Sequence, residues 1–145
     1  MSKVYVTADL HLGHAKLLEI RKITDDDIVN NWNSVVTVRD VVYVLGDVFR
    51  LDRINDMNGI KKLILGNHDK YPISRYLEYF SSVHAMKEYN HCILTHIPVH
   101  ESQIRRWHLN VHGHTHANKI NHPFYKCVSL EHTNYTPILL DKVIR

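Results

Sequence analysis

Short apolar runs recur along the chain, and a polar cluster follows each of them. Val41 to Leu45 is almost wholly apolar and ends at Gly46-Asp47. Lys62 to Leu65 ends in the same way at Gly66-Asn67-His68-Asp69. Short, continuous apolar runs are typical of strands buried on both faces, as in parallel sheets. The pattern predicts an α/β fold whose polar residues gather at strand ends, where such proteins hold their chemistry.

The same reading predicts the other elements of the chain. Thr24 is a candidate N-cap because Asp27 stands three residues later and acidic residues fill the first turn. Helices are expected over residues 15–22, from Thr24 to about Val36, and over 51–57, 73–80 and 102–107. Strands are expected over residues 3–7, 41–45, 62–65, 83–86, 92–95, 109–112, 124–130 and 138–144.

Length and composition bound the class of protein. A chain of 145 residues is enough for one compact domain, expected over residues 1–145, and too short for two. The net charge of +3 permits an anionic partner, nucleic acid included, without requiring one. No apolar stretch has the length of a signal peptide or membrane span, so a cytoplasmic protein without membrane contact is expected. Cys92 and Cys127 lack Cys-x-x-Cys spacing, which makes a thiolate zinc site unexpected.

The polar clusters are rich in metal-binding side chains. Thirteen histidines occur in the chain, and several stand beside Asp, Asn or Gly. Imidazole, carboxylate and amide ligands without sulfur suit Mn, Fe, Zn, Co or Ni. A catalytic zinc ion usually takes about three protein ligands. Seven candidate ligands therefore favour two divalent ions that share a ligand, and these candidates are Asp9, His11, Asp47, Asn67, His96, His114 and His116.

Charge indicates the reaction. Two divalent cations carry four positive charges, whereas Asp9 and Asp47 are the only anionic candidate ligands. A bridging hydroxide would lower the excess and act as the nucleophile, and a phosphate ester would balance the remainder. Phosphoester hydrolysis follows as the expected reaction. His68 is the candidate general acid for the leaving oxygen, and Asp69 either orients it or braces the loop. His14 is a candidate contact to substrate.

The five motifs resemble those of the calcineurin-like metallophosphoesterase superfamily. Its pattern is Asp-x-His, Gly-Asp, Gly-Asn-His-Asp or Glu, a histidine, and Gly-His-x-His, and all five occur here in order. His14 and the pair Trp32-Asn33 further resemble small prokaryotic and phage-type members. The resemblance implies a two-sheet β-sandwich flanked by helices and two ions, with manganese favoured. It assigns Asp9, His11 and His116 to one ion, Asn67, His96 and His114 to the other, Asp47 to both, and His68 to the acid.

These observations predict a metal-dependent phosphoesterase. A phosphodiesterase for nucleotides or nucleic-acid-derived diesters is favoured, because 145 residues leave little chain for a separate recognition lobe. A phosphomonoesterase, such as a protein phosphatase, is the alternative enzyme. A non-catalytic binding scaffold is the third reading, and the full set of candidate ligands argues against it. The sequence does not predict the oligomeric state.

Overall fold

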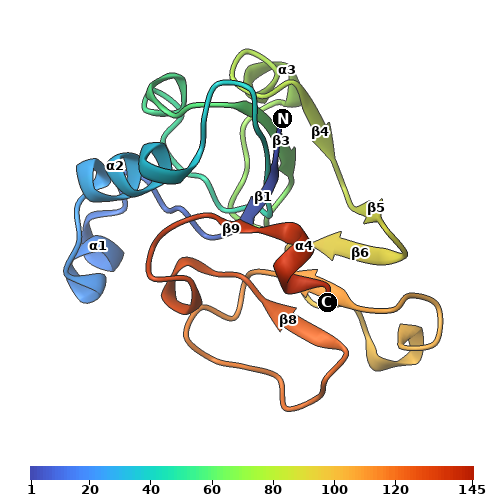
Figure 1. Cartoon of the computed structure of the whole chain (residues 1–145). Coiled ribbons are helices and arrows are strands. Elements are labelled where there is room, and N and C mark those ends of the chain that lie inside the picture. The colour runs from blue at the N-terminus through green and yellow to red at the C-terminus, as the bar shows by residue number, and fades with distance from the viewer.

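The computed structural model describes residues 1–145 and contains two β-sheets with helices (Figure 1). The first sheet has the strand order β4-β3-β2-β1-β9. Its strands are β1 (Val4–Thr7), β2 (Val41–Val44), β3 (Ile60–Ile64), β4 (Ser82–His84) and β9 (Ile138–Leu139). Strands β1 to β4 are mutually parallel, and β9 runs antiparallel to β1. The predicted α/β class is confirmed at this level.

The second sheet is smaller and also mostly parallel. Its strands are β5 (Lys87–Tyr89), β6 (Cys92–Thr95), β7 (Asn110–His112) and β8 (Tyr125–Cys127), in sequential order. β6, β7 and β8 are parallel, whereas β5 pairs with β6 as an antiparallel hairpin. Both sheets therefore present the carboxyl ends of several parallel strands at one edge.

Helices accompany mainly the first sheet. They are α1 (Ala15–Arg21), α2 (Asp25–Val35), α3 (Ile73–Tyr76) and α4 (Leu140–Val143). Thr24 and Asp27 form the predicted capping box, because each side chain accepts a hydrogen bond from the other residue's backbone N–H. Figure 1 shows α1 and α2 together on one side of the molecule. None of the helices combines the length and the apolar character that crossing a bilayer demands.

Side chains of the first sheet alternate between two apolar clusters. Tyr5 and Val42 point into a cluster that includes Trp32 of α2. Their neighbours Val6 and Tyr43 point into a second cluster. That cluster also contains Leu94 and Val111 of the second sheet. This period-two alternation places helices on one face of the first sheet and the second sheet against the other.

The loops after the parallel strands meet at the edge between the two sheets. Asp9 follows β1 and its N–H donates to Gly46 O after β2, at 3.0 Å. In the second sheet, Gly113 N–H donates to His96 O, also at 3.0 Å. Parallel strands end at a common edge, so residues far apart in sequence are brought together there.

Several short elements differ from the prediction. Residues 51–57 contain only a 3₁₀ turn at Ile54–Asp56, and residues 102–107 only one at Glu101–Gln103. A single turn suffices to bury Leu51, Ile54 and Met57, whereas residues 102–107 have no buried stripe to hold a helix. The expected strand 138–144 is wrong beyond residue 139, where α4 begins, because an apolar run alone does not distinguish a strand from a helix.

Other expected elements are shorter than predicted. The helix expected over residues 73–80 ends at residue 76. The strand expected over 124–130 is confined to Tyr125–Cys127, and a 3₁₀ turn follows at Leu130–His132. The strand expected over 83–86 corresponds to β4, and β5 was not anticipated. Short hairpin strands such as β5 carry too few residues for a clear alternation.

The pair Trp32-Asn33 fixes the turn that leads into β3. Trp32 Nε1 donates to Asn58 O at 2.8 Å, and Asn33 Nδ2 donates to Asp56 O at 2.8 Å. Asn33 Oδ1 in turn accepts from Asn58 N at 2.9 Å. Since Trp32 is also 1% exposed, the pair anchors both the apolar core and the start of the central strands.

Replacing Trp32 by alanine should destabilise the protein strongly. Trp32→Ala removes a buried aromatic side chain and leaves Asn58 O without its donor, so the free energy of unfolding should fall by about 3–5 kcal/mol. Chemical denaturation measures this change in the free energy of unfolding. Val38→Ala, at a position that is 73% exposed, is the control and should change it by less than about 0.5 kcal/mol. Equal effects of the two substitutions would contradict this account.

Candidate metal centre

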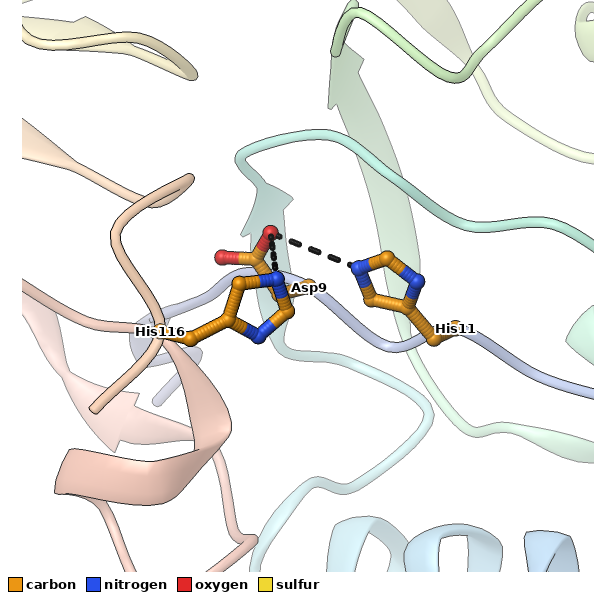
Figure 2. A group of neighbouring side chains, drawn as sticks. All are labelled: Asp9, His11 and His116. Carbon is orange, nitrogen blue, oxygen red and sulfur yellow. Dashed lines mark ion pairs between the residues drawn. The ribbon is translucent and has the colours of Figure 1, made fainter. Parts of the chain in front are cut away.

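One group of candidate ligands consists of Asp9, His11 and His116 (Figure 2). His11 Nε2 lies 3.6 Å from Asp9 Oδ1, and His116 Nε2 lies 3.8 Å from the same oxygen. Asp9 and His11 follow β1, whereas His116 follows β7 in the other sheet. The structure thus brings together the three residues that the family resemblance assigns to one ion.

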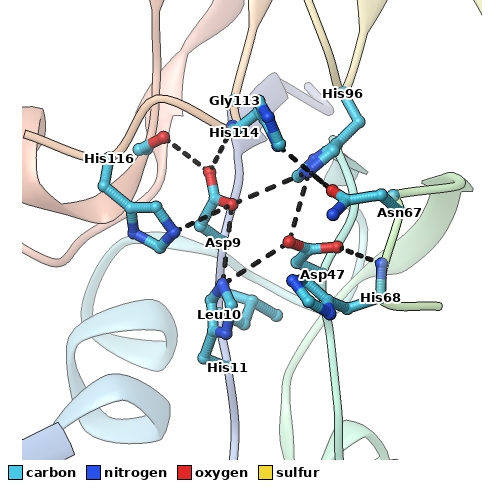
Figure 3. Close-up of polar contacts among 12 residues, drawn as sticks. Asp9, Leu10, His11, Asp47, Asn67, His68, His96, Gly113, His114 and His116 are labelled. Carbon is cyan, nitrogen blue, oxygen red and sulfur yellow. Dashed lines mark hydrogen bonds and ion pairs between the residues drawn. The ribbon is translucent and has the colours of Figure 1, made fainter. Parts of the chain in front are cut away.

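A second group consists of Asp9, Asp47 and His96, with Asn67 and His114 beside it (Figure 3). His96 Nε2 lies 3.2 Å from Asp47 Oδ2 and 2.9 Å from Asn67 Oδ1. His114 Nδ1 lies 3.1 Å from the same Asn67 oxygen. All seven predicted ligands therefore converge on the edge between the sheets.

Asp9 and Asp47 connect the two groups. Asp9 Oδ1 faces His11 and also lies 4.0 Å from His96 Nε2. Asp47 Oδ2 is 3.6 Å from His11 Nε2 of the first group and 3.2 Å from His96 of the second. Two ligands each about 2.1 Å from one ion are about 3.0–3.4 Å apart at right or tetrahedral angles. The observed separations of 2.9–4.0 Å are close to that range.

Buried polar atoms without partners show that the site suits a cation. Asp9 Oδ1 and both ring nitrogens of His11 are buried and form no hydrogen bond. A buried carboxylate oxygen that accepts no hydrogen bond is costly, and a metal ion would compensate it. Burial also lowers the pKa of His11, against the influence of Asp9. The neutral imidazole is the form that ligates a metal.

The backbone at the site adopts a conformation that few residues tolerate. Asp9, His11, Asp47, His114 and His116 all have positive φ, between 47° and 71°. Such left-handed non-glycine residues cost about 1–3 kcal/mol each and persist where the surrounding structure enforces them. Five of the seven candidate ligands thus share a positive φ.

Close packing against Asp9 explains why position 113, in the last motif, is a glycine. A Cβ atom at Gly113 would lie 2.6 Å from Asp9 Oδ2. A side chain there would displace the carboxylate that accepts from His114 N at 2.9 Å and from Ser129 Oγ at 2.5 Å. The glycine therefore allows the loop after β7 to lie directly against the loop after β1.

Hydrogen bonds from Nδ1 set the tautomers of two histidines. His96 Nδ1 donates to Leu45 O at 2.6 Å, and His116 Nδ1 lies 3.0 Å from Glu131 Oε2. Both contacts leave Nε2 free to face the centre. Burial opposes a charged His96, but the carboxylates of Asp47 and Asp9 outweigh it and raise its pKa. The hydrogen bond to Glu131 raises the pKa of His116.

Arg21 and Glu131 support the centre and were not anticipated from the sequence. Arg21 donates to Asp9 O at 2.8 Å and forms an ion pair with Glu131 at 3.0 Å. Burial would raise the pKa of Glu131, but the hydrogen bonds from His116 and Arg21 lower it to about 2. Carboxylate partners of ligating histidines commonly orient the ring. No local pattern links residues 110 positions apart, so sequence reading had no signal for this pair.

His68 and Asp69 have different surroundings. The His68 backbone N–H donates to Asp47 Oδ1 at 2.9 Å, and its exposed ring stands beside the centre (Figure 3). The Asp69 carboxylate accepts from the N–H groups of Asp47, Val48 and Gly66, at 2.7–2.9 Å. These three bonds favour the predicted loop-bracing role of Asp69 over the orientation of His68.

His14 lies near the centre, and its side chain caps the N-terminus of α1. Its Nδ1 accepts from Leu17 N at 3.2 Å and thereby caps α1. Its ring centroid is 5.6 Å from that of His11 and 4.9 Å from that of Phe49. The second ring nitrogen is left for other contacts, so the proposed contact of His14 with substrate stays a prediction.

The chain is similar to proteins of mycobacterial phages and of an archaeon. The Gene 66 protein of Mycobacterium phage L5 is 41% identical over an alignment of 91 residues, and the match covers 52% of this chain and 44% of that protein. The uncharacterized protein MJ1445 of Methanocaldococcus jannaschii is 30% identical over an alignment of 169 residues, and the match covers 100% of this chain and 91% of that protein. The chain belongs to the same family as the latter. No family model matches the sequence.

A solved structure shares the fold. The crystal structure of a protein of unknown function from Aquifex aeolicus superposes with a TM-score of 0.79 at 21% identity. The match covers 99% of this chain and 98% of that one. The arrangement of two sheets and helices is therefore a fold already seen in a crystal structure.

Substituting Glu131 should weaken metal binding without removing a ligand. Glu131→Gln takes the carboxylate away from His116 and Arg21, and loss of such a support typically lowers metal affinity by about 10–100-fold. Titration calorimetry with Mn²⁺ on protein shown to be folded by circular dichroism measures the change. Glu78→Gln, at an exposed position in an ion pair with Arg75, is the control. Unchanged affinity in Glu131→Gln would show that Glu131 has no part in holding the site.

Proposed function

We propose that this protein is a phosphoester hydrolase that depends on two divalent metal ions. It acts on phosphodiesters of nucleotides or nucleic-acid fragments. The observation that carries the proposal is the convergence of seven carboxylate, amide and imidazole side chains around the unpartnered Asp9 Oδ1. This charge and ligand set suits two hard or borderline cations, of which manganese is the one proposed.

The fold is consistent with the proposed superfamily. Val6 and Tyr43 of the first sheet and Leu94 and Val111 of the second share one apolar cluster. Helices pack on the outer face of the first sheet. We propose that this arrangement is the helix-flanked β-sandwich of calcineurin-like metallophosphoesterases, with the candidate ligands in the loops at strand ends.

In the proposed hydrolysis, the candidate ligands and His68 have different roles. Bound divalent ions would supply Lewis acidity toward the phosphoryl oxygens and lower the pKa of an attacking water. Asp9 and Asp47 set the negative charge of the centre, and the histidines complete it with neutral donors. His68 stands outside the ligand set with an exposed ring, and in this proposal it donates a proton to the departing oxygen.

Loss of Asp47 should abolish hydrolysis. Asp47→Asn removes one of the two negative charges that face both ligand groups, so turnover of bis(p-nitrophenyl) phosphate in Mn²⁺ should fall at least about 100-fold. Metal content by elemental analysis should fall in parallel. Asp141→Asn, at an exposed position in α4, is the matched control. A metal-loaded wild-type protein inert to both diesters and monoesters would favour the scaffold reading instead.

The same assay separates the two enzyme classes. The proposed phosphodiesterase turns over bis(p-nitrophenyl) phosphate with a higher kcat/KM than p-nitrophenyl phosphate. The reverse preference would make the protein a phosphomonoesterase with the same metal centre.

His68 should matter most where the leaving group is poor. A nitrophenolate departs without a proton, whereas an alkoxide needs one, so His68→Ala should lower kcat on alkyl diesters by about 10²–10⁴-fold. The loss on nitrophenyl esters should be less than about tenfold. His108→Ala, at another exposed histidine, serves as the control. Equal losses on both kinds of ester would show that His68 is not the acid.

A further inference from the structure

A cavity of about 270 Å³ lies beside the candidate metal centre. The side chains that give it its chemical character are Phe49, Arg50, His68, Lys70 and Tyr71. His68 belongs to both the cavity and the rim of the centre, so the cavity adjoins the position of the proposed acid. Its volume is slightly below the roughly 300 Å³ of small ligand pockets, which suits a group of about one nucleotide.

Two aromatic rings line this cavity at different depths. The Phe49 ring is half-buried and lies 4.6 Å from the ring of His11 and 5.6 Å from that of His68. Tyr71 is 49% exposed, and its ring packs against Tyr76 at 5.8 Å. A half-exposed ring held by a buried neighbour offers a fixed face on which a planar group stacks.

The charged groups of the cavity are both cations. Arg50 is held by Asp52 through two hydrogen bonds, which fixes its position and partly neutralises it. Lys70 forms no ion pair or side-chain hydrogen bond in the structure. No carboxylate lines the cavity. The free Lys70 ammonium and the two rings therefore favour a ligand that is both planar and anionic.

We propose that this cavity binds the nucleotide on the leaving side of the scissile phosphate. The inference rests on the proposed function, because His68 marks the leaving side only if it is the acid. The attacking water loses one proton to solvent as its oxygen bonds to phosphorus, and the bond from phosphorus to the nucleotide's ester oxygen breaks. The proton of His68 passes to that ester oxygen, and His68 regains a proton from solvent. The base stacks on Tyr71 and Phe49, and the next phosphate of the departing strand contacts Lys70.

The lining favours a nucleic-acid fragment over a phosphopeptide. Every base has a flat π-face, and successive phosphates along a strand place an anion within a few ångströms of it. When a phosphorylated serine is hydrolysed, the leaving group is a peptide, which has neither a base nor a second phosphate at a fixed position. The substrate class is thus a single-stranded oligonucleotide, cleaved so that the departing part carries a base in the cavity.

Kinetics on two substrates tests the assignment. The first is a thymidine trinucleotide, and the second is bis(p-nitrophenyl) phosphate, which has no second phosphate. In Tyr71→Ala the ratio of kcat/KM for the trinucleotide to that for the nitrophenyl ester should fall about tenfold, as for loss of a stacked base. In Lys70→Ala the ratio should fall several-fold. Lys142→Ala, at an exposed lysine of α4, should leave it unchanged.

Direct binding provides a readout apart from turnover. A single-stranded thymidine oligonucleotide titrated into the wild-type protein without added metal should bind more weakly as the salt concentration rises. In Lys70→Ala the slope of log affinity against log salt should be shallower by about 0.7, the value for one contact to a single-strand phosphate. The same slope in both proteins would remove Lys70 from the proposed site.

The outcomes distinguish this inference from the proposed function. If the wild-type protein hydrolyses the nitrophenyl ester and the ratio does not move in either variant, the nucleotide assignment is overturned while the hydrolase stands. If the metal-loaded protein hydrolyses neither substrate, the proposed function fails, and with it the leaving-side assignment. Turnover of the trinucleotide with the expected losses in both variants supports the two together.

Discussion

The arrangement of the site depends on the contacts that the Asp9 carboxylate makes. One oxygen accepts hydrogen bonds from His114 N and Ser129 Oγ, which lie in the loops after β7 and β8 of the second sheet. The other oxygen has no hydrogen-bonding partner and faces three histidines. A single buried side chain thus joins the two sheets and leaves a negative charge directed into the centre. The close approach at Gly113 and the buried Arg21 under the Asp9 carbonyl both maintain this contact.

Much of the candidate site could be read from local sequence because each ligand lies directly after an apolar run. Asp9, Asp47 and Asn67 follow three strands that are mutually parallel, so their common location is a property of parallel pairing. The pair Arg21 and Glu131 could not be found in this way. Its members meet only because α1 and the segment after β8 pack on the same loop, and neither residue has an unusual local context.

The sequence-based predictions that were wrong or ambiguous are those in which one local pattern fits two structures. Leu140 ends an apolar run that fits a strand, yet it begins α4 and packs between the sheets. Asp69 was ambiguous because a carboxylate beside a candidate acid suits either orientation of that acid or support of the backbone. Three backbone N–H donors from two loops favour support. Such choices depend on which groups lie nearby in space, and the sequence does not state that.

The spread of the ligands along the chain has a consequence for folding. Asp9 lies in the first loop, His116 lies 107 positions later, and the Glu131 that orients His116 comes later still. A fragment that ends before the loop after β7 contains Asp9, Asp47 and His96 but lacks His116, so a nascent chain cannot fill both ion sites until most of it has been synthesised. Occupancy of both sites would therefore report the finished tertiary structure, because the complete pair of sites and the native contacts between the sheets form together.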